Sequence, residues 1–262
     1  MSADRTQIVR FRRDGRPVWG LLEDGVVYAA EGDPFTGLRR GSAVDPVHDV
    51  GLLPPVSPSK IVAIGLNYLD HITEDAPDFQ KPENPIIFLK PPSSVIGPGD
   101  TIVLPTGAEH VDTEGELAVV IGRRARHVHA EDAYDYILGL ACSNDVSARD
   151  YQFKDGQWAR AKGFDTFTPL GPTIATGVRA DDLAIVSRLN GEVRQRSTTA
   201  KLLFGVPELV EFITSVMTLE PGDVIMTGTP AHPPRMQPGD VVEVEIESVG
   251  TLRNPVEAER PA

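Results

Sequence analysis

Residues 110–122 read HVDTEGELAVVIG, and the rest of the chain can be understood from these thirteen residues. Leu117 to Ile121 is apolar and rich in β-branched residues, which predicts a buried strand. Side chains alternate faces along a strand, so Glu114 and Glu116 point the same way, one rung apart. Two adjacent carboxylates at the mouth of a buried strand repel each other. Water or a cation must relieve this repulsion, and a hard divalent ion with oxygen ligands would do so.

A third acid favours the metal over a simple solvated strand end, which is what an isolated Glu-x-Glu pair usually is. Asp145 follows a second apolar run, Ile137 to Ala141. With Glu114 and Glu116 it would supply three oxygen ligands, and Mg²⁺ or Mn²⁺ would keep its remaining positions for water or substrate. Zinc is disfavoured, because no thiolate or paired histidines accompany the acids.

Composition and charge exclude several classes of protein. The chain has 262 residues, 40% hydrophobic and 24% charged, which is typical of a globular protein with one sizeable domain and a small appendage. The net charge of −13 argues against nucleic acid and anionic membranes as partners. Cys142 is the single cysteine, so no internal disulfide forms, which fits a reducing cytosol. No apolar run approaches the length of a membrane span, and we expect a cytoplasmic protein.

Residues 1–55 are predicted to form a small N-terminal β domain. Short apolar runs lie at 7–11, 18–22 and 26–28, separated by turns at Asp14-Gly15 and Asp24-Gly25. Asp-Gly turns between such runs are typical of β-hairpins. The proline-rich segment 53–58 would be a stiff linker, and residues 60–262 would form the catalytic domain.

The larger domain is predicted to be a β-rich roll with few helices. Pro-Gly-Asp occurs at 98–100, 221–223 and 238–240, each time before a β-type run. Proline followed by glycine suits the centre of a type II turn, where the glycine takes a positive φ. Only 131–139 and 207–219 are expected to be helices, together with a short helix or turn at 67–75. The fold class is therefore mixed and strand-dominated.

His71 and Glu74 are candidates for a general base. Their spacing of three places them on one face of a helix, where the carboxylate would orient the imidazole and raise its basicity. An ordinary surface pair is the competing interpretation, and the favoured one for this motif alone. The remaining histidines lack such a partner in the sequence and are taken as surface or structural residues: His48, His110, His127, His129 and His232.

Four further side chains are candidates for the site. Lys162 lies among apolar and glycine residues, and a buried ammonium needs a partner, so it could balance the charge of a metal site. Arg149 and Gln152 could hold a substrate carboxylate and a carbonyl oxygen. Thr229, in the turn Thr227-Gly228-Thr229-Pro230, could present a hydroxyl and backbone N–H groups to a ligand, although most such turns are only turns.

Together these segments resemble the fumarylacetoacetate hydrolase family, from about Lys60 to Asp240. The resemblance rests on GLNYLDH (65–71), FLKPPSS (88–94), EGELAVVIG (114–122), NDVSARD (144–150), KGFDT (162–166) and TGTP (227–230). Each motif alone would be weak, but their occurrence in this order is specific. Membership implies a β-roll core with a smaller N-terminal β domain, often as a homodimer.

The resemblance also implies the chemistry. It places Mg²⁺ or Mn²⁺ on Glu114, Glu116 and Asp145, with Asp70 as a possible outer ligand. The implied roles are base for His71 with Glu74 and enolate stabilisation for Lys162 and Gln152. We expect Arg149, Thr229 and Tyr68 to bind the substrate. The implied substrates are small 2-oxo or 1,3-dicarbonyl acids.

We expect metal-dependent cleavage of a C–C bond in an acylpyruvate or fumarylpyruvate, through a pyruvate enolate stabilised by the metal. A loop from Asp70 to Pro85 would close over the site. Three alternatives remain: an oxaloacetate-type decarboxylase, a 2-hydroxyhepta-2,4-diene-1,7-dioate isomerase, and a non-catalytic protein that binds 2-oxo acids with a metal. The chain departs from the family at residues 231–237, AHPPRMQ, where a glycine-rich segment is common. This departure is expected to change one wall of the pocket and to bring His232 or Arg235 to the ligand.

Overall fold

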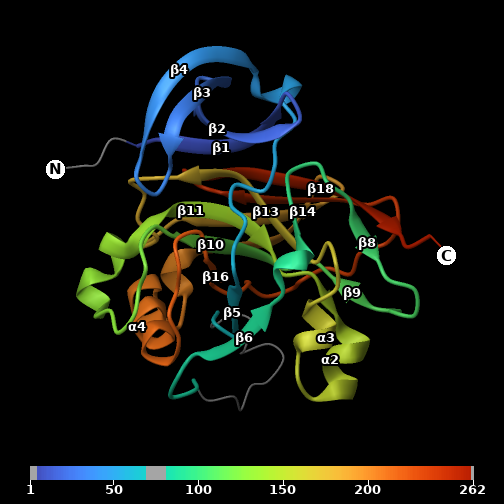
Figure 1. Ribbon diagram of the computed structural model, residues 1–262. Helices are drawn as coiled ribbons and strands as arrows, with labels where there is room; N and C mark the ends of the chain where they lie inside the picture. The colour runs from blue at the N-terminus through green and yellow to red at the C-terminus, as the bar shows by residue number, and fades with distance from the viewer. Residues whose placement is uncertain (1–4, 69–80, 261–262) are drawn as a thin grey trace.

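The protein, represented by a computed structural model that describes residues 5–68 and 81–260, is built on one long sheet (Figure 1). The strands follow the order β4-β3-β2-β1-β13-β11-β10-β16-β5-β6, with β7 beside β13. The strands from β5 onward are β5 (Ile61–Gly65), β6 (Ile86–Lys90), β7 (Val95–Ile96), β10 (Gly115–Ile121), β11 (Ile137–Asn144), β13 (Thr168–Ala175) and β16 (Val224–Met226). All seven residues of β10 are buried, so the predicted buried strand is confirmed.

A second sheet covers one face of β10. It has the order β15-β14-β17-β18-β8. Its strands are β8 (Ile102–Leu104), β14 (Ala184–Leu189), β15 (Glu192–Thr198), β17 (Val241–Ile246) and β18 (Gly250–Ala258). Leu117 and Val119 pack with this sheet, whereas Ala118 and Val120 pack in a separate core on the other face. Because β10 is buried on both faces, it reads as a continuous apolar run.

The N-terminal strands extend the long sheet. They are β1 (Gln7–Arg13), β2 (Arg16–Glu23), β3 (Val26–Asp33) and β4 (Gly37–Pro46), drawn in blue in Figure 1. Asp14-Gly15 and Asp24-Gly25 have positive φ, as hairpin turns of this type require. β1 pairs with β13 through Gln7↔Ala175 and Ile8↔Ile174. Hydrogen bonding therefore runs without interruption from these strands into the core, and the domain boundary near residue 55 stays a prediction.

The three Pro-Gly-Asp segments are turns that start strands, as predicted. Gly99, Gly222 and Gly239 have φ values of 79°, 87° and 96°. In each turn the aspartate carboxylate accepts a hydrogen bond from the N–H of the residue before the proline, at 2.8, 2.8 and 2.6 Å. The turns lead into β8, β16 and β17. The aspartate thus locks the turn that the glycine makes possible.

Helices are few among the described residues. The α-helices are α2 (Arg149–Asp155), α3 (Ala159–Lys162) and α4 (Val206–Val216), and the 3₁₀ helices are η1 (Val47–Asp49), η2 (Pro92–Ser94), η3 (Ala130–Tyr136) and η4 (Thr199–Lys201). None of the helices in the described part of the chain combines the length and the apolarity that a membrane crossing requires. The strand-dominated fold is confirmed. α4 matches the prediction for 207–219. The helix predicted for 131–139 is a 3₁₀ helix as far as residue 136, and the prediction is wrong for the last three residues. Ile137–Gly139 pairs with β10 instead, because that long-range pairing outweighs local preference.

Candidate active site

Three buried carboxylates meet at the N-terminal end of β10. Glu114 precedes the strand, Glu116 lies on it, and Asp145 follows its neighbour β11. The antiparallel register pairs Gly115 with Asn144, and the Asp145 N–H donates to the Glu114 carbonyl at 2.9 Å. Each carboxylate offers one oxygen within 4.8 Å of the other two, and their exposures are 4%, 2% and 1%. The structure therefore brings the distant Asp145 to the Glu-x-Glu pair.

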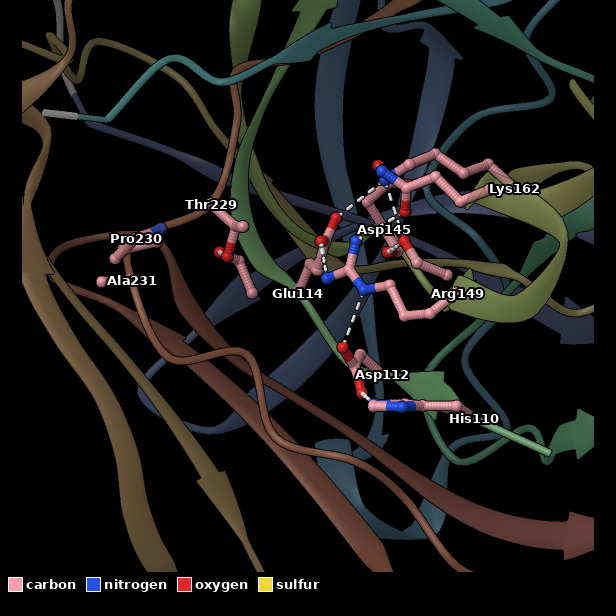
Figure 2. Close-up of polar contacts among 12 residues, drawn as sticks. His110, Asp112, Glu114, Asp145, Arg149, Lys162, Thr229, Pro230 and Ala231 are labelled. Atoms are coloured by element: carbon pink, nitrogen blue, oxygen red, sulfur yellow. Dashed lines mark hydrogen bonds and ion pairs between the residues drawn. The ribbon is translucent and has the colours of Figure 1, made fainter. Parts of the chain in front are cut away.

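Two buried lysines neutralise Asp145 from opposite sides. Lys162, at the end of α3, donates from Nζ to Asp145 Oδ2 at 2.5 Å and to Glu114 Oε2 at 2.8 Å. Figure 2 shows Lys162 and these two carboxylates pointing toward one another. Lys90, the last residue of β6, donates to Asp145 Oδ1 at 2.5 Å. Lys90 has no assigned role in the sequence analysis. The signal for it was a lysine ending an apolar strand directly before two prolines.

Burial and neighbouring charges shift the pKa values of these groups. Burial, together with Asp145 and Glu114, raises the pKa of Glu116 well above its usual range. Burial alone would lower the pKa of Lys162, but Asp145 and Glu114 more than offset it, and the pKa of this lysine is raised. The ion pairs with Asp145 and Glu114 therefore favour the charged form of Lys162. Burial lowers the pKa of Lys90, although Asp145 opposes the shift.

Arg149 connects three acceptors around the site. It is the first residue of α2, and its Nε donates to Asp112 Oδ2 at 2.7 Å. Nη1 donates to Gln152 Oε1 at 2.8 Å, and Nη2 donates to Glu114 Oε1. Burial alone would lower the pKa of Arg149, but Glu114 and Asp112 raise it above its usual range. The guanidinium is thus a permanent cation held against a candidate metal ligand.

The turn at 227–230 is bound to β10 from the other side. The Gly228 N–H donates to Glu116 Oε2 at 2.8 Å, and the Thr229 hydroxyl donates to the Gly115 carbonyl at 3.0 Å. Gln195 donates to Thr229 Oγ1 at 2.9 Å and accepts from the Gly115 N–H at 3.2 Å. Gln195 is 2% exposed and is absent from the sequence analysis. Gln195 was hard to recognise in the sequence, because it lies between two charged residues of β15, Arg194 and Arg196, which are exposed.

The pocket at these residues is lined by charged and polar side chains together with a few apolar ones. Seven predicted site residues line it: Glu114, Glu116, Asp145, Arg149, Gln152, Lys162 and Thr229. Ile64, Leu66 and Trp158 form the apolar part. A Cβ atom at Gly65 would lie 2.3 Å from the Trp158 ring, so the glycine permits this ring to lie against the end of β5.

The remaining predicted residues lie elsewhere. Tyr68 is fully buried, forms a β-bridge with Leu202 and is not part of the pocket lining. Asp70, His71 and Glu74, and with them most of the expected loop, lie outside the described residues. Arg235 pairs with Asp112 through the backbone, and its guanidinium donates to the Glu109 carbonyl. Neither Arg235 nor His232 lines the pocket.

The ligand set and its charge fit a divalent cation. All three candidate ligands are oxygens, the type that Mg²⁺ and Mn²⁺ prefer. One oxygen of each carboxylate lies within 4.8 Å of the other two, whereas ligands that share one ion at bonds of roughly 2.1 Å lie at most about 4.2 Å apart, so small side-chain movements would complete the site. The four acids and three bases of the cluster leave a formal charge of −1: Asp112, Glu114, Glu116 and Asp145 against Lys90, Arg149 and Lys162. A divalent ion would make the cluster positive and suited to an anion.

The sequence of residues 60–257 matches the fumarylacetoacetate (FAA) hydrolase C-terminal family. The chain belongs to the fumarylacetoacetate hydrolase family. Residues 6–55 separately match the family described as Rv2993c-like, N-terminal. The resemblance inferred from the six ordered motifs is thereby confirmed.

Known members of the family with different activities are similar to this chain. The mitochondrial oxaloacetate tautomerase Fahd2a of Rattus norvegicus is 42% identical over 80% of this chain and 71% of its own length. The crystal structure of 2-hydroxyhepta-2,4-diene-1,7-dioate isomerase from Mycobacterium marinum is 41% identical, with a TM-score of 0.90 over 98% of this chain and 100% of that one. Maleylpyruvate hydrolase from Sphingobium sp. SYK-6, solved with manganese(II) and pyruvate, is 29% identical, with a TM-score of 0.80 over 97% and 100%. These relatives support an enzymatic function and a divalent metal for this member of the fumarylacetoacetate hydrolase family.

Proposed function

We propose that this protein is an enzyme that forms the enolate of a small 2-oxo acid at a site for Mg²⁺ or Mn²⁺ on Glu114, Glu116 and Asp145. The observation that carries the proposal is the Lys162 ammonium, which contacts two of these carboxylates inside the pocket. A divalent ion, when bound, would polarise the 2-keto oxygen of such a substrate as a Lewis acid.

The protein side chains would stabilise negative charge that develops on the substrate. Asp145 and Glu114 favour the charged form of Lys162, which would place a positive charge beside the oxygen of an enolate. Arg149 occupies the carbonyl oxygen of Gln152, which leaves the amide N–H groups as the part of Gln152 that donates to a substrate. Arg149 also adds positive charge for the substrate carboxylate.

Keto–enol tautomerisation or double-bond isomerisation of a 2-oxo dicarboxylate is the first candidate reaction. The similarity to an oxaloacetate tautomerase and to a 2-hydroxyhepta-2,4-diene-1,7-dioate isomerase favours it. Both reactions pass through an enol or enolate and need proton transfer without an attacking water. The fixed charge of Lys162 suits this intermediate. A protein that only binds 2-oxo acids would not need that charge at the reacting oxygen.

A metal-exchange assay tests the proposal. We expect Mn²⁺- or Mg²⁺-loaded protein to accelerate the enol-to-keto conversion of oxaloacetate, measured by the loss of enol absorbance. Removal of the metal with EDTA should lower the rate at least ~100-fold, because the Lewis acid supplies several kcal/mol. Adding Mn²⁺ back should restore the rate. Binding of the acid without turnover in Mn²⁺ would instead support the binding protein.

Hydrolysis of an acylpyruvate or fumarylpyruvate is the second candidate, favoured by the similarity to maleylpyruvate hydrolase. In this reaction His71, oriented by Glu74, would deprotonate the water that attacks the distal carbonyl. His71→Ala should then lower hydrolysis about 10²- to 10⁴-fold. Oxaloacetate decarboxylation, which needs no attacking water, should fall less. Pyruvate release from both substrates measures this difference, and equal losses would contradict the assigned role of His71.

A further inference from the structure

Asp112 is a buried carboxylate beside the site that the proposed reaction does not use. It is 5% exposed, and both of its oxygens have partners. Oδ2 accepts from Arg149 Nε at 2.7 Å, and Oδ1 lies 2.8 Å from His110 Nε2. Figure 2 shows these residues as a row that runs from His110 through Asp112 and Arg149 to Glu114. His110 therefore does have a carboxylate partner, contrary to the interpretation of the sequence.

We propose that Asp112 is a positioning residue that fixes Arg149 and, through it, the carboxylate of Glu114 and the amide of Gln152. The guanidinium is a rigid planar fork, so the acceptor on Nε sets the direction of the other two nitrogens. Those nitrogens hold Glu114 Oε1 and Gln152 Oε1. Hydrogen-bond partners of metal ligands orient those ligands, and their removal typically lowers metal affinity about 10- to 100-fold.

The backbone holds Asp112 in place from two sides. Asp112 ends β9 (Val111–Asp112), which pairs with β12 (Ser147–Ala148) directly before Arg149. On the other side, Asp112 forms a bridge with Arg235, and the Thr113 N–H donates to the Pro234 carbonyl at 3.1 Å. The segment 231–237 was expected to line the pocket. Its backbone instead bonds to the strand that carries Asp112.

The test compares Asp112→Ala and Asp112→Asn with the wild type in two measurements. NMR of the Arg149 Nε–H, assigned with Arg149→Lys, reports whether this group is held. We expect slow solvent exchange in the wild type, at least tenfold faster exchange in Asp112→Ala, and an intermediate rate in Asp112→Asn, which keeps a neutral acceptor. Calorimetric titration with Mn²⁺ reports the effect on Glu114. We expect Asp112→Ala to weaken Mn²⁺ binding about 10- to 100-fold.

A double-mutant cycle distinguishes an effect of Asp112 that passes through Arg149 from a general destabilisation of the site. If Asp112 acts through Arg149, adding Asp112→Ala to Arg149→Met should change Mn²⁺ affinity less than twofold. Asp150→Asn is the matched control, because Asp150 accepts from the Glu109 and His110 N–H groups of the same segment. It should leave Mn²⁺ affinity within twofold.

Three results would overturn the proposal: unchanged Arg149 Nε–H exchange in Asp112→Ala, an undiminished loss in the Arg149→Met background, or an equal loss in Asp150→Asn. The Mn²⁺ measurement rests on the proposed function, whereas the NMR measurement does not. A wild type that fails to bind Mn²⁺ would therefore refute the proposed metal site, and the NMR result would still decide the role of Asp112. Should Asp112→Ala not fold, Asp112→Asn carries both measurements.

Discussion

The Lys162→Met variant is expected to turn over its 2-oxo acid about 10²- to 10³-fold more slowly than the wild type, the usual cost of removing one fixed donor to a developing oxyanion. Lys162 contacts two candidate ligands in the pocket, Glu114 and Asp145, and these carboxylates raise its pKa and so favour its charged form. The steady-state kcat on oxaloacetate and on an acylpyruvate, with saturating Mn²⁺, measures the effect.

Two controls test whether a lower kcat in Lys162→Met reflects the loss of the Lys162 charge. Lys154→Met removes an exposed lysine from α2 and should leave kcat unchanged. Mn²⁺ titration of Lys162→Met should show that the metal still binds, which separates lost charge stabilisation from lost metal. If Lys162→Met keeps the wild-type kcat on both substrates, the proposed role of Lys162 in stabilising the enolate is wrong.

The Lys90→Met variant is expected to lose about 3–5 kcal/mol of unfolding free energy, the usual cost of removing one member of a buried ion pair. Lys90 is 1% exposed, and its ammonium donates to Asp145 Oδ1. Methionine fills a similar volume but leaves that oxygen buried beside an apolar group. Urea unfolding measures the loss, and Tm should fall by roughly 6–20 °C for a chain of this size.

Leu89→Met is the matched control for Lys90→Met. Leu89 precedes Lys90 on β6 and is 50% exposed, so its replacement should change the unfolding free energy by less than about 0.5 kcal/mol. A loss under about 1 kcal/mol in Lys90→Met would show that Lys162 alone compensates Asp145. Mn²⁺ affinity of the folded variant would then show whether Lys90 acts on the metal site at all.

The candidate ligands could be predicted because their signal is local. Two acids at spacing two on an apolar run require a common face of a strand, and this requirement holds in any fold. The same reasoning predicted the Pro-Gly-Asp turns, since only glycine takes the positive φ without strain. Lys162 was found for a similar reason, because an ammonium among apolar residues needs a partner.

The partners of the supporting residues could not be predicted from the local sequence. Lys90 meets Asp145 across 55 positions, Arg149 meets Asp112 across 37, and Gln195 meets Thr229 across 34. Each looks like an ordinary polar residue in its own segment. The strand at 137–139 was misread for the same reason, because its pairing partner in β10 lies outside any local window.

Residue types and short spacings alone indicated the chemistry proposed for this protein: candidate oxygen ligands for a hard divalent ion, a lysine to balance their charge, and the ordered motifs of the fumarylacetoacetate hydrolase family. These features depend on residue type and short spacing, which the chain carries in any conformation. The three-dimensional fold was needed to show that Lys90 shares Asp145 with Lys162, and that Arg149 bonds to both Asp112 and Glu114. Such partnerships depend on strand register between distant segments, and register is set by the packing of the whole core.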